Sequence, residues 1–317
     1  MKTVGNNIWE ELGRREAIIR NEYAKKRIAL KPRQGLALAL EEPNALAANL
    51  KSTKSASDAA VQEAVQAFHV IYSIAESIEL CLNSGLDITR QLSQMASGTT
   101  DFGTPNHKNS RIYFKDFEYE LFIASCLIRR GLKPEFLEDR SDPIGEMRVE
   151  GILIECKHPN STGQIEGNIS KFARNLRAAG KFGIFAIAVE DAHHMGDHRA
   201  FATGLDHHVW LEAKRDEMEL VGLRRAAFAS KFENILGLIH TQSIVQIVGG
   251  NTSMSRLGTS LLFERPAQDL TTARMIAEVF NPHPVLYSQE HAGSIGHEPQ
   301  VTQVWRAEGA KRGRNGV

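Results

Sequence analysis

Cysteine is scarce in this chain, and long hydrophobic runs are missing from it. The three cysteines among its 317 residues, Cys81, Cys126 and Cys156, are odd in number and lie in apolar stretches, which indicates reduced, buried thiols rather than a disulfide framework. No run approaches the roughly 20 apolar residues that span a bilayer, and the N-terminal stretch has no hydrophobic signal core. A cytoplasmic protein that does not enter membranes is therefore expected.

The chain also has no formal net charge at pH 7. Lys and Arg together number 38, and so do Asp and Glu, so the field of the whole molecule does not attract nucleic acid or acidic lipid. Any binding of nucleic acid must therefore come from a local patch.

The chain divides by composition into three parts. Residues 1–100 are rich in Ala, Leu, Glu and Lys and predict a helical accessory region. Turn-forming residues between Met95 and Ser110 predict a domain boundary. A second domain is expected over residues 101–287, and residues 288–317, which lack periodicity, are expected to be partly disordered.

The middle part alternates helical and strand-like segments. A helix is expected to end at Gly131, three strand-like segments follow, and a second helix is expected between an N-cap at Asn168 and a stop at Gly180. The nearly continuous apolar run FGIFAIAVED is typical of a strand buried on both faces. A long helix and two late strands complete the order α-β-β-β-α-β-α-β-β, which predicts an α/β fold with a mixed central sheet flanked by helices.

The stretch EMRVEGILIECK predicts a β-hairpin. Glu150 and Gly151 form its turn, where glycine supplies the positive φ that a two-residue turn needs. Pairing outward from this turn sets Glu146 opposite Glu155. Side chains alternate between the faces of a strand, so one face is wholly apolar and is expected in the core. That face carries Met147, Val149, Ile152, Ile154 and Cys156.

The other face would bring two carboxylates together. With Glu146 opposite Glu155, the Cβ atoms would lie roughly 5 Å apart, and at an effective dielectric of about 20 the repulsion is about 3 kcal/mol. A divalent cation with oxygen ligands, Mg²⁺ above all, would compensate this repulsion. Lys157, on the same face, would serve a metal-bound water or the charge that develops on a phosphate, which indicates metal-assisted phosphodiester hydrolysis.

The stretch GEMRVEGILIECK resembles the core of the PD-(D/E)xK nuclease superfamily, in which an acidic residue opens one strand and hydrophobic-Glu-x-Lys ends the next. The resemblance places Glu155 and Lys157 at the (D/E)xK positions and Glu146 at the preceding acid. Asp142 is the alternative acid if the connection is longer. The element order from about residue 111 to 191 follows the family pattern, which implies a restriction-endonuclease-like core.

The superfamily also has a helix before the hairpin that often carries a glutamate aimed at the metal. Here Glu120 has the better spacing, and Glu118 is the other choice. The resemblance implies a Mg²⁺- or Mn²⁺-dependent nuclease with Glu120, Glu146 and Glu155 as metal ligands and Lys157 as a catalytic residue. The implied partner is nucleic acid, DNA before RNA, and a homodimer stays open.

Two other interpretations stay open as well. A non-catalytic module that binds nucleic acid or protein could keep the same fold. A zinc-dependent enzyme would use a group of histidines whose spacing does not match the helical H-E-x-x-H pattern. These are His193, His194, His198, His207 and His208. On the helix after the hairpin, Gln164, Asn168 and Lys171 could reach a substrate, although a solvated helical face is the simpler interpretation.

Overall fold

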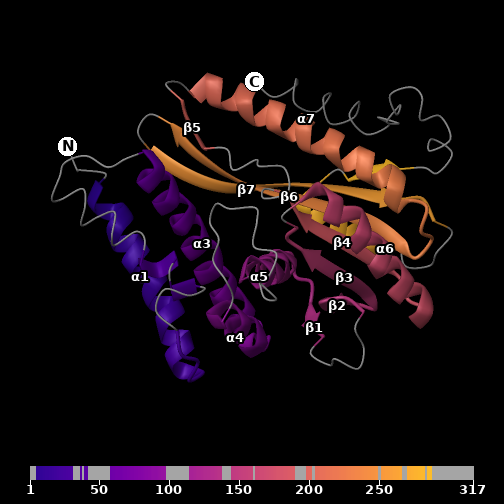
Figure 1. The fold of residues 1–317 in the computed structure, drawn as a ribbon, viewed down its shortest axis with the longest axis horizontal. Coiled ribbons are helices and arrows are strands. Elements are labelled where there is room, and N and C mark those ends of the chain that lie inside the picture. Colours follow the sequence, from indigo (N-terminus) through magenta and orange to yellow (C-terminus); the bar gives the residue numbers. More distant parts are fainter. Residues whose placement is uncertain are drawn as a thin grey trace, which may run out of the picture.

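A mixed β-sheet with helices on both faces forms the centre of the molecule in the computed structural model (Figure 1). The structure describes residues 5–30, 36–37, 39–41, 58–97, 114–137, 144–159, 161–189, 198–201, 204–248, 251–265, 270–282 and 284–287. In chain order, the helices and strands are α1 (Gly5–Lys25), α3 (Asp58–Asn83), α4 (Thr89–Ser97), α5 (Phe114–Arg129), β1 (Glu135–Phe136), β2 (Met147–Val149), β3 (Ile152–Lys157), α6 (Thr162–Ala179), β4 (Gly183–Ala188), β5 (His198–Phe201), α7 (Gly204–Ala229), β6 (Ile235–Val248), β7 (Asn251–Phe263), α8 (Leu270–Phe280) and β8 (Val285–Tyr287).

The sheet combines parallel and antiparallel strands. Its order is β1-β2-β3-β4-β6-β7-β8, and β5 pairs with the far end of β6. Strands β1, β2 and β3 are antiparallel, β3, β4 and β6 are parallel, and β6 and β7 form a long antiparallel hairpin. The crossover helices α6 and α7 cover one face of the parallel centre, and other helices, α5 among them, cover the opposite face, so both faces are buried as such strands require. The predicted α/β class with a mixed, helix-flanked sheet is confirmed.

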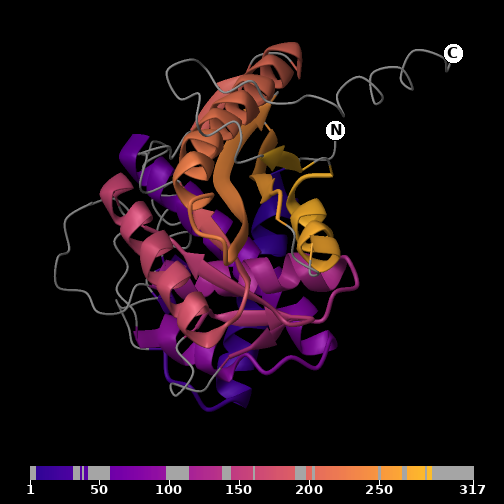
Figure 2. The ribbon, with the colours of Figure 1, turned by 90° about the vertical axis from the view of Figure 1, so that its right-hand side faces the viewer.

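Alternating side chains of the central strands build two hydrophobic clusters, one on each face of the sheet. In β4, which is buried throughout as predicted, Ile184 and Ala186 join the first cluster and Phe185 and Ile187 join the second. The first cluster packs against α1, α3, α4, α5 and α8, and the second packs against α6 and α7. Figure 2 shows α7 and α8 on opposite sides of the β6–β7 hairpin. The N-terminal helices therefore share one core with the sheet.

The bounds of several predicted elements differ from those observed. The helix expected to begin at Asn168 begins at Thr162, with Ser161 in the extended conformation of an N-cap residue, whereas its stop at Gly180 is confirmed by a left-handed conformation. The two late strands, predicted over residues 243–250 and 260–266, begin earlier as β6 and β7, and β5, α8 and β8 were not predicted. Residues 240–242 of β6 are polar yet fully buried, so the hydrophobicity pattern reveals only the later part of this strand.

Two expectations from composition can be compared with the structure. Cys81 and Cys156 are buried free thiols, and Cys126 is a half-buried one. Burial raises the pKa of Cys81 to about 12 and that of Cys126 to about 11, so both thiols are protonated at neutral pH. None of the described helices combines the length and the hydropathy that crossing a bilayer requires.

Two predicted features lie outside the described residues. The domain boundary between Met95 and Ser110 falls mostly in residues 98–113, and the tail comprises residues 288–317.

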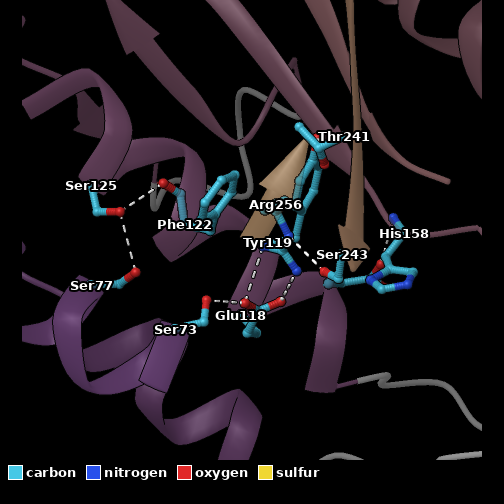
Figure 3. A network of polar contacts seen from close by, with 11 residues as sticks. Ser73, Ser77, Glu118, Tyr119, Phe122, Ser125, His158, Thr241, Ser243 and Arg256 are labelled. Atoms are coloured by element: carbon cyan, nitrogen blue, oxygen red, sulfur yellow. Dashed lines mark hydrogen bonds and ion pairs between the residues drawn. The ribbon is translucent and has the colours of Figure 1, made fainter. Parts of the chain in front are cut away.

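A buried ion pair joins the N-terminal helices to the β6–β7 hairpin (Figure 3). The guanidinium of Arg256, on β7, donates two hydrogen bonds of 3.2 and 3.1 Å to the carboxylate of Glu118, on α5. Its Nε donates to the hydroxyl of Ser243 on β6, and the hydroxyl of Ser73 on α3 donates to Glu118. The guanidinium also lies 4.3 Å from the ring centroid of Phe122. Arg256 and Glu118 thus form a buried clamp, which connects α3, α5, β6 and β7.

Replacement of Arg256 by methionine is expected to lower the free energy of unfolding by about 3–5 kcal/mol, because it leaves the carboxylate of Glu118 buried without its cation. The side chains of this pair are only 5% and 3% exposed, so solvent screens their interaction little. Urea unfolding of the variant and the wild type measures the change. As a matched control, Arg129→Gln removes an ion pair with Glu76 in which both side chains are more than half exposed, and its cost should stay below about 1 kcal/mol. An equal effect of the two substitutions would contradict the clamp.

Candidate active site

The predicted hairpin is present, with the predicted register near its turn. Val149 pairs with Ile152, and Met147 pairs with Ile154. Glu150 and Gly151 both have positive φ, 47° and 91°, as the two central residues of a tight hairpin turn require.

One face of this hairpin is anchored in the core. All five residues of the predicted apolar face belong to the first hydrophobic cluster, which confirms that prediction. On the other face, the side chains of Glu155 and Lys157 at the end of β3 are only 16% and 28% exposed. Leu153, earlier on the same strand face, lies in the second cluster. Glu155 and Lys157 therefore lie next to a buried position of the strand and are not part of a solvent-exposed strand edge.

Glu146 is not in the predicted cross-strand pair with Glu155. The regular pairing ends at Met147 and Ile154, and the backbone N–H of Glu146 donates to the carbonyl of Ile154 at 2.9 Å. Two successive residues of the first strand are therefore directed to Ile154, which is the pattern of a β-bulge. The preceding Gly145 has a φ of 84°, a conformation that suits glycine, and so the chain enters the hairpin with a bend that the register argument did not include.

The ammonium group of Lys157 lies between the two carboxylates. Its Nζ atom is 2.8 Å from an oxygen of Glu146 and 2.8 Å from an oxygen of Glu155. Burial by itself would lower the pKa of Lys157, but the charges of Glu155 and Glu146 outweigh it and raise that pKa above its ordinary value. The positive charge that the sequence argument required between the glutamates is supplied by the protein itself.

The two glutamates respond differently to this lysine. Burial raises the pKa of Glu146, but Lys157 and Arg90 outweigh it, and the pKa is lowered overall. For Glu155, burial is the larger influence and the pKa is raised, with Lys157 opposing and the charge of Glu146 adding to the rise. Glu146 is therefore the carboxylate that is most securely ionised.

Glu120, on α5, extends the cluster toward the N-terminal helices. Its side chain is 3% exposed and accepts a hydrogen bond of 2.9 Å from the amide of Gln91 on α4. Arg90, on the same helix, places one guanidinium nitrogen 3.7 Å from Glu120 and another 3.4 Å from Glu146. Burial and the charge of Glu146 raise the pKa of Glu120 well above its ordinary value. Helix α4 therefore belongs to the site.

Helix α5 directs its two buried glutamates to different places. Glu118 and Glu120 are two residues apart, and a helix turns by about 200° over that distance. Glu118 consequently meets Arg256 in the buried clamp, and Glu120 meets Arg90 and Gln91. Of the two glutamates considered for the site, the structure brings Glu120 to the hairpin carboxylates.

Of the remaining residues singled out in the sequence, the structure describes the side chains of those on α6 alone. Asp142, the alternative to Glu146, lies outside the described residues, as do the side chains of the grouped histidines. On α6, Gln164 and Lys171 are exposed and Asn168 is half-buried. The charge of Lys171 opposes the rise in the pKa of Glu155, after the larger influences of burial, Lys157 and Glu146.

Three residues of the site were missed by sequence analysis: Arg90, Gln91 and Asp116. Asp116, in the first turn of α5, accepts a hydrogen bond of 3.1 Å from the backbone N–H of His158, directly after Lys157. Burial raises the pKa of Asp116. These residues stand in helices with no local motif, and only the packing of α5 on β3 and of α4 on α5 brings them to the hairpin.

The donor atoms of the cluster suit a hard cation. Glu120, Glu146 and Glu155 offer carboxylate oxygens alone, which favours Mg²⁺ or Mn²⁺ over zinc. Within the described ranges, however, no group of three or more acidic, histidine or cysteine side chains is arranged to hold a metal ion. Mg²⁺ needs only one or two protein carboxylates, so Glu146 and Glu155 fit this role once Lys157 moves from between them.

Comparisons with known proteins add no assignment. The chain has no match among protein-family models, and no significant match among curated protein sequences or solved structures.

Replacement of Glu120 by glutamine is expected to stabilise the protein at neutral pH. Since the pKa of Glu120 is raised in the folded state from its reference value of 4.5, the folded chain binds more protons than the unfolded chain, and stability falls as pH rises above that value. Glutamine removes this penalty and keeps an oxygen that accepts from Gln91. Thermal unfolding at about pH 5 and pH 8 should show a larger gain for the variant at the higher pH. A variant that loses stability at pH 8 would refute this account of Glu120.

Proposed function

We propose that this chain is a metal-dependent nuclease that hydrolyses phosphodiester bonds, with DNA as the expected substrate, on a restriction-endonuclease-like core. The observation that carries the proposal is the convergence of Glu120, Glu146, Glu155 and Lys157 from one helix and both strands of a hairpin. Buried acidic groups with opposed pKa shifts around a lysine are a frequent mark of functional sites.

The order of elements gives further support. Helix α5, the antiparallel strands β1 to β3, helix α6 and the parallel strand β4 follow one another as in the PD-(D/E)xK pattern. Gly183, at the start of β4, has no room for a side chain: a Cβ atom there would lie 2.6 Å from the ring of Phe172 on α6. This close packing fixes α6 against the sheet beside the start of β3, where Gly183 pairs with Leu153.

In the proposed mechanism, Glu146 and Glu155 hold the cation, and Glu120 assists from α5. A bound Mg²⁺ or Mn²⁺ would polarise the phosphodiester and lower the pKa of a coordinated water. Lys157 has a raised pKa beside the two carboxylates and is therefore protonated at neutral pH. It is better suited to orient the attacking water or to stabilise negative charge on the phosphate than to accept a proton.

A second candidate function is a non-catalytic module that binds nucleic acid or protein. It is favoured by the ion pairs inside the cluster, because the positive charges of Lys157 and Arg90 already compensate the negative charges of the carboxylates without a metal ion. In that case the ion pairs would be structural.

Glu155→Gln and Lys157→Met are each expected to reduce Mg²⁺-dependent cleavage of DNA at least ~100-fold, because each removes a group that acts on the metal or the reacting water. Cleavage of supercoiled and linear DNA, and of RNA, measures the loss. Glu135→Gln on β1 is the matched control, since its side chain is 63% exposed and pairs with Arg148 away from the cluster. Wild-type protein that cleaves none of these substrates would overturn the proposal in favour of the binding module.

The metal requirement gives a separate test. Chelation is expected to abolish cleavage, and Mg²⁺ or Mn²⁺ should restore it, because oxygen donors alone form the cluster. Metal analysis of the purified protein should find no stoichiometric zinc. Stoichiometric zinc with chelator-sensitive activity would point instead to the histidines.

A further inference from the structure

Arg90 occupies a position that the PD-(D/E)xK resemblance does not account for. It comes from α4, in the N-terminal helical region, and its guanidinium contacts both Glu120 and Glu146. Its side chain is 32% exposed, and its guanidinium carbon lies 5.6 Å from the ring centroid of Phe117. Among the described residues, its buried Nη1 atom donates no hydrogen bond. The guanidinium therefore has unused donor capacity beside the carboxylates.

The charge balance of the cluster changes when a cation binds. Arg90 and Lys157 place two positive charges beside the carboxylates of Glu120, Glu146 and Glu155. A divalent cation adds two more positive charges, so the metal-bound cluster attracts a phosphodiester, which carries one negative charge, more strongly than the metal-free cluster does.

Arg90 contributes to this attraction. Without its charge, the metal-bound cluster would be more negative by one charge and would attract a phosphodiester less strongly. A cation on Glu146 also competes with the guanidinium for that carboxylate, which leaves the planar group of Arg90 free to turn to another anion nearby. Guanidinium groups match phosphate oxygens through paired hydrogen bonds.

We infer that Arg90 binds the phosphodiester of the substrate in the metal-bound site, so that helix α4 is part of the nucleic-acid-binding surface. This inference rests on the proposed nuclease function and assigns the substrate contact within the same site. Arg90 exchanges its carboxylate partners for the phosphate when the metal takes Glu146.

Binding of nucleic acid without cleavage tests the inference. A short fluorescein-labelled DNA duplex, or its RNA counterpart, is titrated with protein in Ca²⁺ and followed by anisotropy, and Mn²⁺ affinity is measured separately by calorimetry. Arg90→Gln should weaken metal-dependent binding of the labelled duplex roughly 10-fold and leave Mn²⁺ affinity unchanged or increased, because a competing cation has been removed. Arg90→Lys keeps the positive charge but lacks the paired hydrogen-bond donors of a guanidinium. Its affinity for the duplex should therefore fall between that of the wild type and that of Arg90→Gln.

Arg129→Gln on α5 serves as the matched control, since it removes one positive charge from an exposed ion pair with Glu76 and should change neither affinity. If Arg90 only holds Glu120 and Glu146 in place, Arg90→Gln would lower Mn²⁺ affinity along with binding of the duplex, and the inference would fail. The inference would also fail if Arg90→Gln bound the duplex as tightly as Arg129→Gln does. Thermal unfolding of each variant confirms that it is folded.

The two proposals fail in different ways. Wild-type protein that binds the duplex in Ca²⁺ through Arg90 but cleaves nothing in Mg²⁺ refutes the nuclease and keeps the phosphate contact. Wild-type protein that cleaves, with Arg90→Gln unchanged in KM and in binding, refutes the contact and keeps the nuclease. Wild-type protein that binds neither metal nor nucleic acid refutes both.

Discussion

The ammonium group of Lys157, held 2.8 Å from both Glu146 and Glu155, is the interaction on which the candidate site depends. Without it, two carboxylates that are each less than a fifth exposed would repel one another at the end of a buried strand. Burying charges is costly, and each such group must be paired to persist. The lysine therefore determines that both glutamates can remain close together, and it also marks where another cation would have to enter.

Helix α5 connects this site to the rest of the molecule. Its two buried glutamates point to opposite sides, one toward the hairpin cluster and the other toward Arg256 on β7. The Arg256 contact joins α3, α5 and the β6–β7 hairpin, so the position of Glu120 is tied to the packing of the N-terminal helices on the sheet. A substitution of Arg256 or Glu118 would therefore be expected to shift Glu120 relative to the carboxylates of the hairpin.

The contribution of α4 changes the interpretation of the N-terminal region. Composition alone indicates an accessory helical part, yet Arg90 and Gln91 contact two of the three carboxylates. Whatever the site does, it does so with residues from the N-terminal helical region as well as from α5 and the hairpin. The helices share the first hydrophobic cluster with the sheet, which explains how such distant segments of sequence can be held in register.

Some features could be predicted from the sequence because they follow from local rules. The alternation of apolar residues in EMRVEGILIECK determines which side of the hairpin is buried, and Glu150-Gly151 determines the turn, since only the backbone conformation of a few neighbouring residues is involved. The continuous apolar run of β4 and the glycine at the end of α6 follow in the same way.

Features that depend on tertiary packing could not be predicted. The bulge that moves Glu146 out of a regular pair, the buried polar residues of β6, and the approach of Arg90 all arise where distant segments meet. The sequence by itself determined which residues of the hairpin are buried and which charged residues follow them, because residue type and alternation are local properties. The tertiary structure alone decided which charges face one another, because burial brings together groups that the chain keeps far apart and then demands that each be paired.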